Sequence, residues 1–462
     1  MTLIKSISGI RGTIGGKPGE SLTPIDIAKY TCAYAELIKK ESNGPYRVVI
    51  GRDARVSGTM VNNLVTGTLM SMGIDVVDIG LSTTPTVEMA VIDLNCNGGI
   101  ILTASHNPWH WNALKLLNST GEFIDDAKGK ELLDIAEAGD FSFAEIDSIG
   151  KITYDDSQIR KHIEKVLALP YIDTFAIRSA KFKVAIDAVN STGGIAIPLL
   201  LRSLGVEQIE ELYCEPTGRF PHNPEPLPEN LEEISKLVVK KRAHVGFVVD
   251  PDVDRLAIVC EDGEMFGEEY TLVAVADYIL SNKTGNTVSN MSSTRALKDV
   301  TEKAGTQYFA SAVGEVNVVK KMKEVNAVIG GEGNGGVILP ELHYGRDALV
   351  GIALFLTHLA KSGKRCSALR SMYPDYFISK NKIQLMPEMD VDFILNTIAD
   401  KYKKHQVNRE DGVKIDFDKE WVQLRKSNTE PIIRIYSESD SQNKAESIAR
   451  KIIDDIKDII RK

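Results

Sequence analysis

The 462-residue chain has little of what marks several large classes of protein. It has only five cysteines, scattered and without a Cys-x-x-Cys pair, which argues against a disulfide framework or a zinc knuckle. Its net charge of −9 leaves no excess of basic residues, so we expect no nucleic-acid partner. No stretch approaches about 18 uninterrupted apolar residues, and the N-terminus lacks a leader-like apolar core. We therefore expect no membrane association and a cytoplasmic location.

What the chain does contain is an alternating order of strands and helices. Apolar runs at 47–51 and 98–103 predict strands, and residues 23–40 have the pattern of a helix. Thr23 is a suitable N-cap for that helix, and Pro24 is suited to its first position. This alternation is typical of parallel-rich sheets covered by helices on both faces.

The order of strand, polar loop and helix recurs along the chain. The stretches "IGRDARVSG", "IDAVNSTGG" and "SNMSSTRAL" each leave a predicted strand and enter a helix, which makes a weak internal repeat. We predict three similar α/β domains with mixed sheets at 1–150, 151–255 and 256–370, and a smaller C-terminal α+β domain at 371–462. The last helix of that domain carries isoleucines at four-residue spacing, namely Ile448, Ile452, Ile456 and Ile460.

The strongest chemical signal is acidic and lies in "DPDVDR", directly after an apolar run. Asp250, Asp252 and Asp254 stand at alternate positions, so an extended chain would project all three to one side. Their mutual repulsion calls for a hard divalent cation, and oxygen-only ligands favour Mg²⁺. A solvated acidic turn is one alternative. A calcium loop is another, although Arg255 stands where such a loop needs glycine.

A second signal is the polar exit of the strand at 98–103, "TASHNP", with Ser105 in the middle. The serine is not in a Gly-x-Ser-x-Gly sequence, which excludes the hydrolase elbow. Neighbours in a turn seldom orient as nucleophile and base, so His106 is not expected to activate Ser105. Taken alone, such a turn is more often structural than catalytic.

A third loop, "RKSNTEPIIR", combines arginines, hydroxyls and free backbone N–H groups around a turn between predicted strands. Such a set suits a phosphate group, because arginine forks and backbone N–H groups match its oxygens. An ordinary polar hairpin is the alternative. The residues of this possible anion site are Arg425, Ser427, Asn428, Thr429 and Arg434.

A glycine-rich loop and three arginines complete the set of candidates. In "GEGNGG" the glycines would let the backbone approach a ligand, while Glu332 and Asn334 could bind sugar hydroxyls. Arg11, Arg52 and Arg55 lie near the ends of predicted strands, where loops tend to line a cleft.

Together these loops resemble the α-D-phosphohexomutase superfamily, and the resemblance covers the whole chain. "TASHNP" is similar to its phosphoserine loop, "DPDVDR" to its metal loop, "GEGNGG" to its sugar loop and "RKSNTEPIIR" to its phosphate loop. The resemblance implies four domains around a central cleft. It departs at Ala113, which replaces a glycine of the family, so this segment must avoid a conformation that only glycine accepts.

The resemblance also implies a chemistry. Ser105 would carry a transferable phosphoryl group and would bind Mg²⁺ together with the three aspartates. Arg11, His106, Lys115 and Arg255 would be the basic residues around that group. Phosphorylated Ser105 would phosphorylate a hexose monophosphate, with a hexose 1,6-bisphosphate as intermediate and activator. The sugar and its other phosphate would be held by Glu332, Asn334, Arg425, Ser427, Asn428, Thr429 and Arg434.

Which hexose phosphate is the substrate depends on smaller likenesses. "GEGNGG" and the overall similarity favour a phosphoglucosamine mutase, which interconverts glucosamine 6-phosphate and glucosamine 1-phosphate for cell-envelope precursors. "SNTEP" favours a phosphomannomutase/phosphoglucomutase instead. A Mg²⁺-dependent phosphatase and a non-catalytic sugar-phosphate-binding relative are further alternatives, although the latter would be expected to have lost Ser105 or an aspartate. The expected state is a monomer or homodimer.

Overall fold

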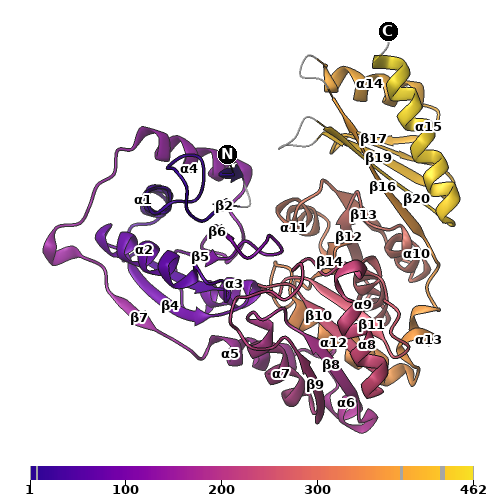
Figure 1. Cartoon of the computed structure of the whole chain (residues 1–462), viewed down its shortest axis with the longest axis horizontal. Coiled ribbons are helices and arrows are strands. Elements are labelled where there is room, and N and C mark those ends of the chain that lie inside the picture. Colours follow the sequence, from indigo (N-terminus) through magenta and orange to yellow (C-terminus); the bar gives the residue numbers. More distant parts are fainter. Residues whose placement is uncertain (1, 7–8, 386–388, 427–431, 461–462) are drawn as a thin grey trace. The chain divides into compact units, whose positions relative to one another are not determined.

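The structure is a computed structural model, and it describes residues 2–6, 9–385, 389–426 and 432–460 (Figure 1). The residues form two compact units, Met1–Thr271 with Asn334–Leu369, and Leu272–Gly333 with Arg370–Lys462.

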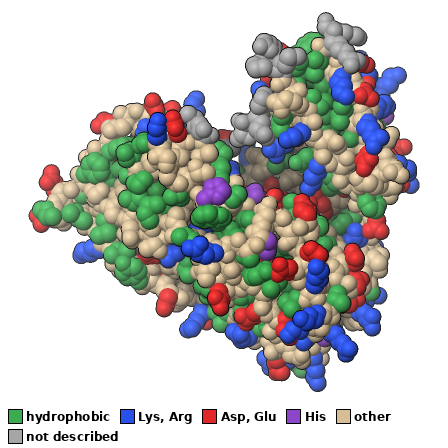
Figure 2. All heavy atoms as spheres, viewed as in Figure 1, with side chains coloured by type: hydrophobic (Ala, Val, Ile, Leu, Met, Phe, Trp, Pro, Cys, Tyr) green, Lys and Arg blue, Asp and Glu red, His purple; other side chains and the backbone are tan. Residues whose placement is uncertain are grey.

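All five cysteines are free. Among the described helices, none is both long and apolar enough to cross a bilayer. Acidic and basic side chains are interspersed on the face drawn in Figure 2.

The first unit opens with a seven-stranded mixed sheet in the order β1-β2-β6-β5-β3-β4-β7. Strand β3 pairs in parallel with β4 and β5, whereas β6 pairs antiparallel with β5 and β2. The strands are β1 (Ile4–Ser6), β2 (Gly9–Thr13), β3 (Arg47–Arg52), β4 (Asp75–Leu81), β5 (Gly98–Leu102), β6 (Trp111–Leu117) and β7 (Ile152–Tyr154).

Helices cover both faces of this sheet. They are α1 (Pro24–Glu41), α2 (Gly58–Ser71), α3 (Thr84–Asp93) and α4 (Asp126–Ala138). Successive residues of a strand point to opposite faces, and β3 follows this rule. Val48 and Ile50 lie in the core that α1, α2 and α4 share, while Val49 lies in the core under α3. The prediction that helices cover both faces of the sheet is therefore confirmed.

Helix α1 begins where the sequence predicts. Thr23 caps it in a capping box with Asp26, and Pro24 occupies the first turn. Further along the helix, the buried Tyr34 hydroxyl lies 2.6 Å from the Leu117 carbonyl oxygen and 3.2 Å from that of Gly99. Gly98 leaves room for this hydroxyl, because a Cβ there would lie 2.1 Å from it. Tyr34 thus ties α1 to the paired strands β5 and β6.

A second mixed sheet completes the first unit, in the order β11-β10-β8-β9. Strands β8, β9 and β10 run parallel, and β11 turns back antiparallel to β10. The strands are β8 (Lys183–Asp187), β9 (Gln208–Leu212), β10 (Val245–Val249) and β11 (Leu256–Cys260). The helices here are α5 (Gln158–Leu167), α6 (Thr174–Ala180), α7 (Gly193–Leu204), α8 (Glu232–Lys241) and α12 (Ala348–Ser362). Three further elements complete the order along the chain: α9 (Glu268–Asn282), β15 (Gly336–Ile338) and α13 (Cys366–Arg370).

The second unit contains a third group of parallel strands and an antiparallel sheet. In the parallel group β12 pairs with β13 and β14. Its elements are β12 (Asn286–Asn290), α10 (Ala296–Lys303), β13 (Tyr308–Ser311), α11 (Glu315–Glu324) and β14 (Ala327–Glu332). The antiparallel sheet has the order β16-β20-β19-β18-β17. Its elements are β16 (Phe377–Gln384), α14 (Val391–Lys401), β17 (Gln406–Asn408), β18 (Val413–Asp416), β19 (Trp421–Lys426), β20 (Ile432–Ser439) and α15 (Gln442–Ile460).

The C-terminal α+β module is as predicted. Ile452 and Ile456 of α15 are buried in its core, and Ile448 and Ile460 pack against that core. Four-residue spacing places these side chains on one face of the helix, which covers the sheet.

The predicted repeat of strand, polar loop and helix is also confirmed. Strand β3 leads into α2, β8 into α7 and β12 into α10. In open α/β sheets the loops at the carboxyl ends of parallel strands gather at one edge and carry ligand sites. Two further loops leave strands of this kind, the "TASHNP" loop after β5 and the "DPDVDR" loop after β10.

Replacing Tyr34 by Phe tests the tie between α1 and the first sheet. The change removes a buried donor from a carbonyl and should lower the free energy of unfolding by about 1–3 kcal/mol. Scanning calorimetry should show an earlier transition for Tyr34→Phe. The exposed Tyr154 offers the control Tyr154→Phe, which should melt with the wild type. Identical melting of both variants would contradict the role of Tyr34.

Candidate active site

The serine loop leaves β5 and holds Ser105 in a strained, buried conformation. Ser105 is 7% exposed and has a φ of +49°, in the left-handed region that residues other than glycine seldom adopt. Its N–H donates to Thr103 Oγ1 at 2.9 Å, and the Thr103 hydroxyl donates to Asp53 at 2.7 Å. Strain of this kind persists only where surrounding contacts hold it, and it is frequent at functional sites.

Arg55 supplies most of those contacts. Its side chain is fully buried and pairs with Asp53 at 2.9 Å. The remaining guanidinium N–H groups donate to backbone carbonyls of the serine loop, at Ser105, Asn107, Pro108 and Trp111. The sequence placed Arg55 only among the arginines near a cleft. The pairing of Asp53 with Arg55 two residues later was the available signal of a buried structural role.

The three aspartates of "DPDVDR" come together, but not in the way the sequence suggests. The prediction of an extended chain is wrong, because the segment between β10 and β11 is a turn in which Val253 has a φ of +64°. Within this turn the carboxylates of Asp250, Asp252 and Asp254 each place an oxygen within 4.8 Å of the others. All three residues are fully buried. A left-handed conformation at a β-branched residue is rare, which marks the turn as strained.

The aspartates and their cationic partners shift one another's pKa values. Burial and the two neighbouring carboxylates raise the pKa of Asp250 well above its usual value. Burial opposes the charge on Asp252, but Lys115, at 2.7 Å, outweighs it and lowers the pKa of that carboxyl. Asp254 pairs with Arg346 at 2.7 Å and lies 3.7 Å from Lys115. The two cations therefore compensate only part of the buried negative charge.

The donor set fits a hard divalent cation. Ser105 Oγ donates to Asp250 at 2.8 Å, so the serine hydroxyl joins the carboxylate cluster. Among the described residues, none donates a hydrogen bond to the buried Oδ1 atoms of Asp252 and Asp254. Buried carboxylate oxygens are costly without a partner, and oxygen ligands of this kind suit Mg²⁺. Ser105 and the three aspartates can therefore hold a metal ion together.

The predicted basic residues differ in how closely they approach Ser105. His106 Nδ1 lies 3.5 Å from Ser105 Oγ, at the limit of a hydrogen bond. Burial and the Arg255 guanidinium lower the pKa of His106 to about 2, which leaves the imidazole uncharged at neutral pH. Arg11 is paired across the strands with Ala113, so it shares a side of the sheet with Lys115. Arg255 donates its backbone N–H to Asp250.

The backbone at Ala113, which replaces a glycine of the family, is one that alanine can adopt. It lies within strand β6 in extended backbone and not in the left-handed region, so no glycine is required. Of the two flanking tryptophans, Trp109 is 55% exposed, and Trp111 is the half-buried first residue of β6. The Arg55 guanidinium donates to the backbone carbonyl of Trp111 and so holds the backbone at this position.

The residues predicted to hold the sugar lie at the end of β14. Glu332 is buried and accepts hydrogen bonds from the Asn290 amide at 2.8 Å and the Gly314 N–H at 3.2 Å. Asn334 accepts from the Gly336 N–H. Gly335 has a positive φ, and a Cβ there would lie 2.3 Å from the Leu256 carbonyl oxygen. Gly335 is therefore required for the close packing of this loop against the backbone at Leu256.

The predicted phosphate site lies in the antiparallel sheet of the second unit. Arg425 of β19 stands directly opposite Arg434 of β20, and Lys382 of β16 stands opposite Arg434 on its other side. Arg425 is paired with Asp411 at 3.4 Å, while the like charges of Lys382 and Arg434, directly opposite one another, favour a further anion at this row of three cations. Lys382 was not predicted. Three predicted members, Ser427, Asn428 and Thr429, lie outside the described residues.

A serine beside a buried carboxylate cluster, with lysine and arginine around it, has the groups that enzymatic phosphoryl transfer requires. Four family profiles, described as domains I, II, III and the C-terminal domain of phosphoglucomutase/phosphomannomutase, match residues 3–143, 160–263, 267–376 and 389–455. The chain belongs to this family, part of the α-D-phosphohexomutase superfamily. It is an isomerase that acts as an intramolecular phosphotransferase on hexose phosphates.

Relatives agree with this assignment over the whole length. A phosphoglucomutase/phosphomannomutase of Thermococcus kodakarensis is 36% identical over 94% of this chain and 95% of its own. A probable phosphoglucosamine mutase of Methanopyrus kandleri is 30% identical over 98% of this chain and 97% of its own. A crystal structure of a family member from Burkholderia thailandensis matches 98% of both chains with a TM-score of 0.85 and 26% identity.

Arg55→Lys should lower turnover while the chain still folds. Lysine keeps the charge but cannot donate along the several directions of a guanidinium, so the serine loop would shift. A displacement of about 1 Å near reacting atoms costs about 10²-fold in rate, which is the expected loss in kcat. Turnover is measured on the hexose phosphate that the wild type converts fastest. The exposed Arg202 gives the control Arg202→Lys, and a wild-type kcat for both variants would contradict the role of Arg55.

Proposed function

We propose that the chain is a phosphoglucosamine mutase that works through a phosphorylated Ser105. The single observation that carries the mechanism is the 2.8 Å hydrogen bond from Ser105 Oγ to Asp250, inside the cluster of buried carboxylates. It supports a serine that gives and takes a phosphoryl group beside a divalent metal. The alternative of a non-catalytic relative is disfavoured, because Ser105 and the three aspartates are all present.

The reaction has two balanced halves. In the first, the bond between phosphorus and Ser105 Oγ breaks and a bond to a sugar hydroxyl oxygen forms, while the hydroxyl proton passes to a base and from it to Ser105 Oγ. We propose His106 for that proton, because its Nδ1 lies 3.5 Å from Ser105 Oγ and the negative charge of a phosphoryl group on Ser105 would raise the pKa that burial and Arg255 lower. The hexose 1,6-bisphosphate then turns over. In the second half, the bond between its other phosphorus and the sugar oxygen breaks, a bond to Ser105 Oγ forms, and the serine proton passes through the base to the sugar oxygen. The same bisphosphate, supplied from outside, would phosphorylate a resting enzyme.

The chain's own charges support this transfer. Ser105, Asp250, Asp252 and Asp254 would hold Mg²⁺, which when bound neutralises charge on a transferring phosphoryl group. The carboxylates raise the pKa of Lys115 against the effect of burial, so its ammonium remains charged beside the moving phosphoryl oxygens. Arg11, which shares a side of the sheet with Lys115, adds a second cation.

The phosphate that stays on the sugar needs its own binding group. The cationic row of Lys382, Arg434 and Arg425 supports such a clamp, because a phosphate would relieve the repulsion within the row. Glu332 and Asn334 remain the residues proposed to bind sugar hydroxyls. Ser427, Asn428 and Thr429 are proposed to complete the clamp.

The choice of sugar rests on the relatives. Several that match over nearly the whole chain are named as phosphoglucosamine mutases, including one of Sulfurisphaera tokodaii named as a phosphoglucosamine/phosphogalactosamine mutase. The 36% identical relative of Thermococcus kodakarensis favours mannose and glucose phosphates as the second candidate.

Phosphorus NMR on the purified chain tests the substrate and Ser105 together. With Mg²⁺ and a trace of hexose bisphosphate, glucosamine 6-phosphate should be converted to its 1-phosphate faster than mannose or glucose 6-phosphate. Ser105→Ala should abolish conversion of all of them, while the exposed control Ser119→Ala should convert them normally. Preference for mannose or glucose would establish the second candidate. Full activity of Ser105→Ala would refute the phosphoserine mechanism.

Arg434→Gln tests the phosphate clamp. Loss of a charge-assisted hydrogen bond of about 1.5–3 kcal/mol should raise KM for the hexose phosphate at least about tenfold. Because the variant also removes like-charge repulsion within the row, its melting temperature should not fall. Initial rates and scanning calorimetry give both values, with the exposed Arg450→Gln on α15 as the matched control. An unchanged KM in Arg434→Gln would exclude the row from phosphate binding.

A further inference from the structure

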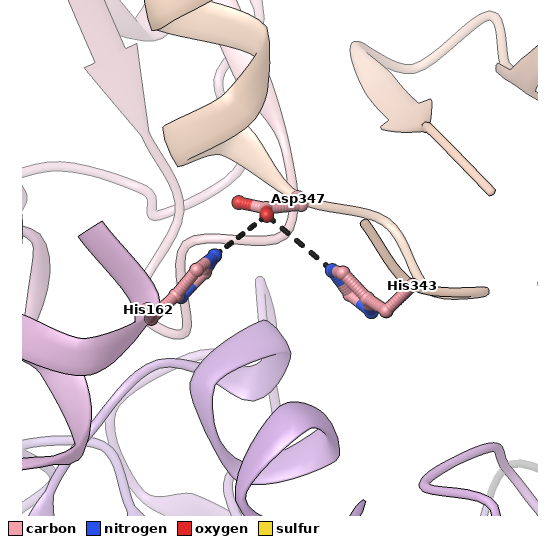
Figure 3. A group of neighbouring side chains, drawn as sticks. All are labelled: His162, His343 and Asp347. Atoms are coloured by element: carbon pink, nitrogen blue, oxygen red, sulfur yellow. Dashed lines mark hydrogen bonds and ion pairs between the residues drawn. The ribbon is translucent and has the colours of Figure 1, made fainter. Parts of the chain in front are cut away.

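A buried cluster of two histidines and an aspartate lies in the first unit, outside the residues assigned to the reaction. His162 comes from α5, while His343 and Asp347 both precede α12, with Asp347 as its N-cap. One oxygen of Asp347, Oδ2, lies 2.8 Å from His162 Nε2 and 3.3 Å from His343 Nε2. Figure 3 shows both imidazole rings directed at this carboxylate. None of the three residues is more than 6% exposed.

The contacts of this cluster are those of hydrogen bonds and not of a metal centre. Tetrahedral zinc with bonds of about 2.0 Å holds its ligand atoms about 3.3 Å apart, and the His162–Asp347 contact of 2.8 Å is shorter. The other oxygen of Asp347 is also engaged, because Oδ1 accepts the N–H groups of Leu349 and Val350 as the N-cap of α12. Asp347 therefore joins two imidazoles to the start of a helix.

His343 carries positive charge between two carboxylates. Its Nδ1 lies 3.3 Å from Glu88 Oε2, and its Nε2 faces Asp347. Although burial opposes the charge, the hydrogen bonds to Asp347 and Glu88 raise the pKa of His343 to about 10. Gly345 permits this close packing, because a Cβ there would lie 1.8 Å from Glu88 Oε2. The segment 343–347 is thus fastened to α3 through Glu88.

One branch of the cluster leads from His162 to Asp252. His162 Nδ1 lies 2.9 Å from the Thr86 hydroxyl, which lies 2.7 Å from the hydroxyl of Thr83, the N-cap of α3. Thr84, the next residue, donates its hydroxyl to Asp252 Oδ2 at 2.6 Å and its N–H to the Asp252 carbonyl at 2.8 Å. The first turn of α3 therefore connects His162 to an aspartate of the metal loop.

The other branch leads from Asp347 to Asp254. Arg346, the preceding residue, donates to Asp254 Oδ2 at 2.7 Å. Ala348, the following residue, donates its N–H to the carbonyl of Val253 at 3.2 Å. Val253 is the residue of the metal loop in the left-handed conformation. Residues on either side of Asp347 therefore hold both the strained backbone and a carboxylate of the loop.

We propose that His162, His343 and Asp347 form a buried clasp that positions Asp252 and Asp254 for the metal ion. They are positioning residues, because their links to the metal loop run through Thr84, Arg346 and Ala348. The clasp rests on the proposed function in one respect, that the three aspartates hold a divalent cation. Residues that orient metal ligands from the outer shell typically change metal affinity about 10–100-fold when they are mutated.

The test measures metal affinity without using catalysis. Binding of Mn²⁺ to the whole chain is followed by the loss of its free electron paramagnetic resonance signal, and Mg²⁺ is then titrated as competitor. His162→Ala should weaken binding of both ions about 10–100-fold. Thr86→Val keeps the shape of the side chain but removes the link from His162 to the first turn of α3. This variant should also bind both ions more weakly than the wild type. Thr86→Val also serves if His162→Ala does not fold.

Two controls separate positioning from simple loss of stability. Val238→Ala removes a fully buried side chain from the core of the second sheet, so it should lower the melting temperature without changing Mn²⁺ affinity. Unchanged affinity in folded His162→Ala and Thr86→Val would overturn the clasp. Zinc bound at one ion per wild-type chain and absent from His162→Ala would overturn it in favour of a metal centre. A wild type that binds Mn²⁺ but converts no hexose phosphate would refute the proposed function, and weaker Mn²⁺ binding by His162→Ala and Thr86→Val would still support the clasp.

Discussion

The arrangement of this protein's reactive groups depends on holding three carboxylates together inside the protein. Asp250, Asp252 and Asp254 repel one another, and burial removes the water that would screen them. Two cations, Lys115 and Arg346, compensate part of that charge. The remaining imbalance favours a divalent cation at the site, next to Ser105, which hydrogen-bonds to Asp250.

The same constraint accounts for the strain in both loops. Ser105 and Val253 each adopt a left-handed backbone, and each is fixed by distant parts of the chain. Arg55 holds the serine loop by donating to the backbone carbonyls of that loop. The segment around Asp347 holds the metal loop through Val253 and Asp254. Strain of about 1–3 kcal/mol at a residue persists only when surrounding structure determines the conformation. Both loops are held in this way, the serine loop by the buried Arg55 and the metal loop by Arg346.

Local order could be predicted from the sequence, because it depends on neighbouring residues. The N-cap Thr23, the strands β3 and β5 and the isoleucine spacing of α15 all follow from patterns of a few residues. The convergence of the aspartates was predicted for the wrong reason, since a turn and not a strand brings them together. The contacts of Arg55, His162 and Arg346 could not be predicted, because each joins segments 50 to 185 residues apart. The Asp53–Arg55 pair was a local signal that Arg55 is buried, but it did not identify the carbonyls that Arg55 binds.

The measurement that tests the central claim most directly is the location of the phosphoryl group on the protein. The chain is incubated with Mg²⁺ and hexose 1,6-bisphosphate, digested, and its peptides are read by mass spectrometry. The account predicts a single phosphate on Ser105, and an isotope label on that phosphate that passes to the sugar when excess unlabelled hexose monophosphate is added. Phosphate on another residue, or continued sugar conversion with no phosphate on Ser105 at any time, would contradict it.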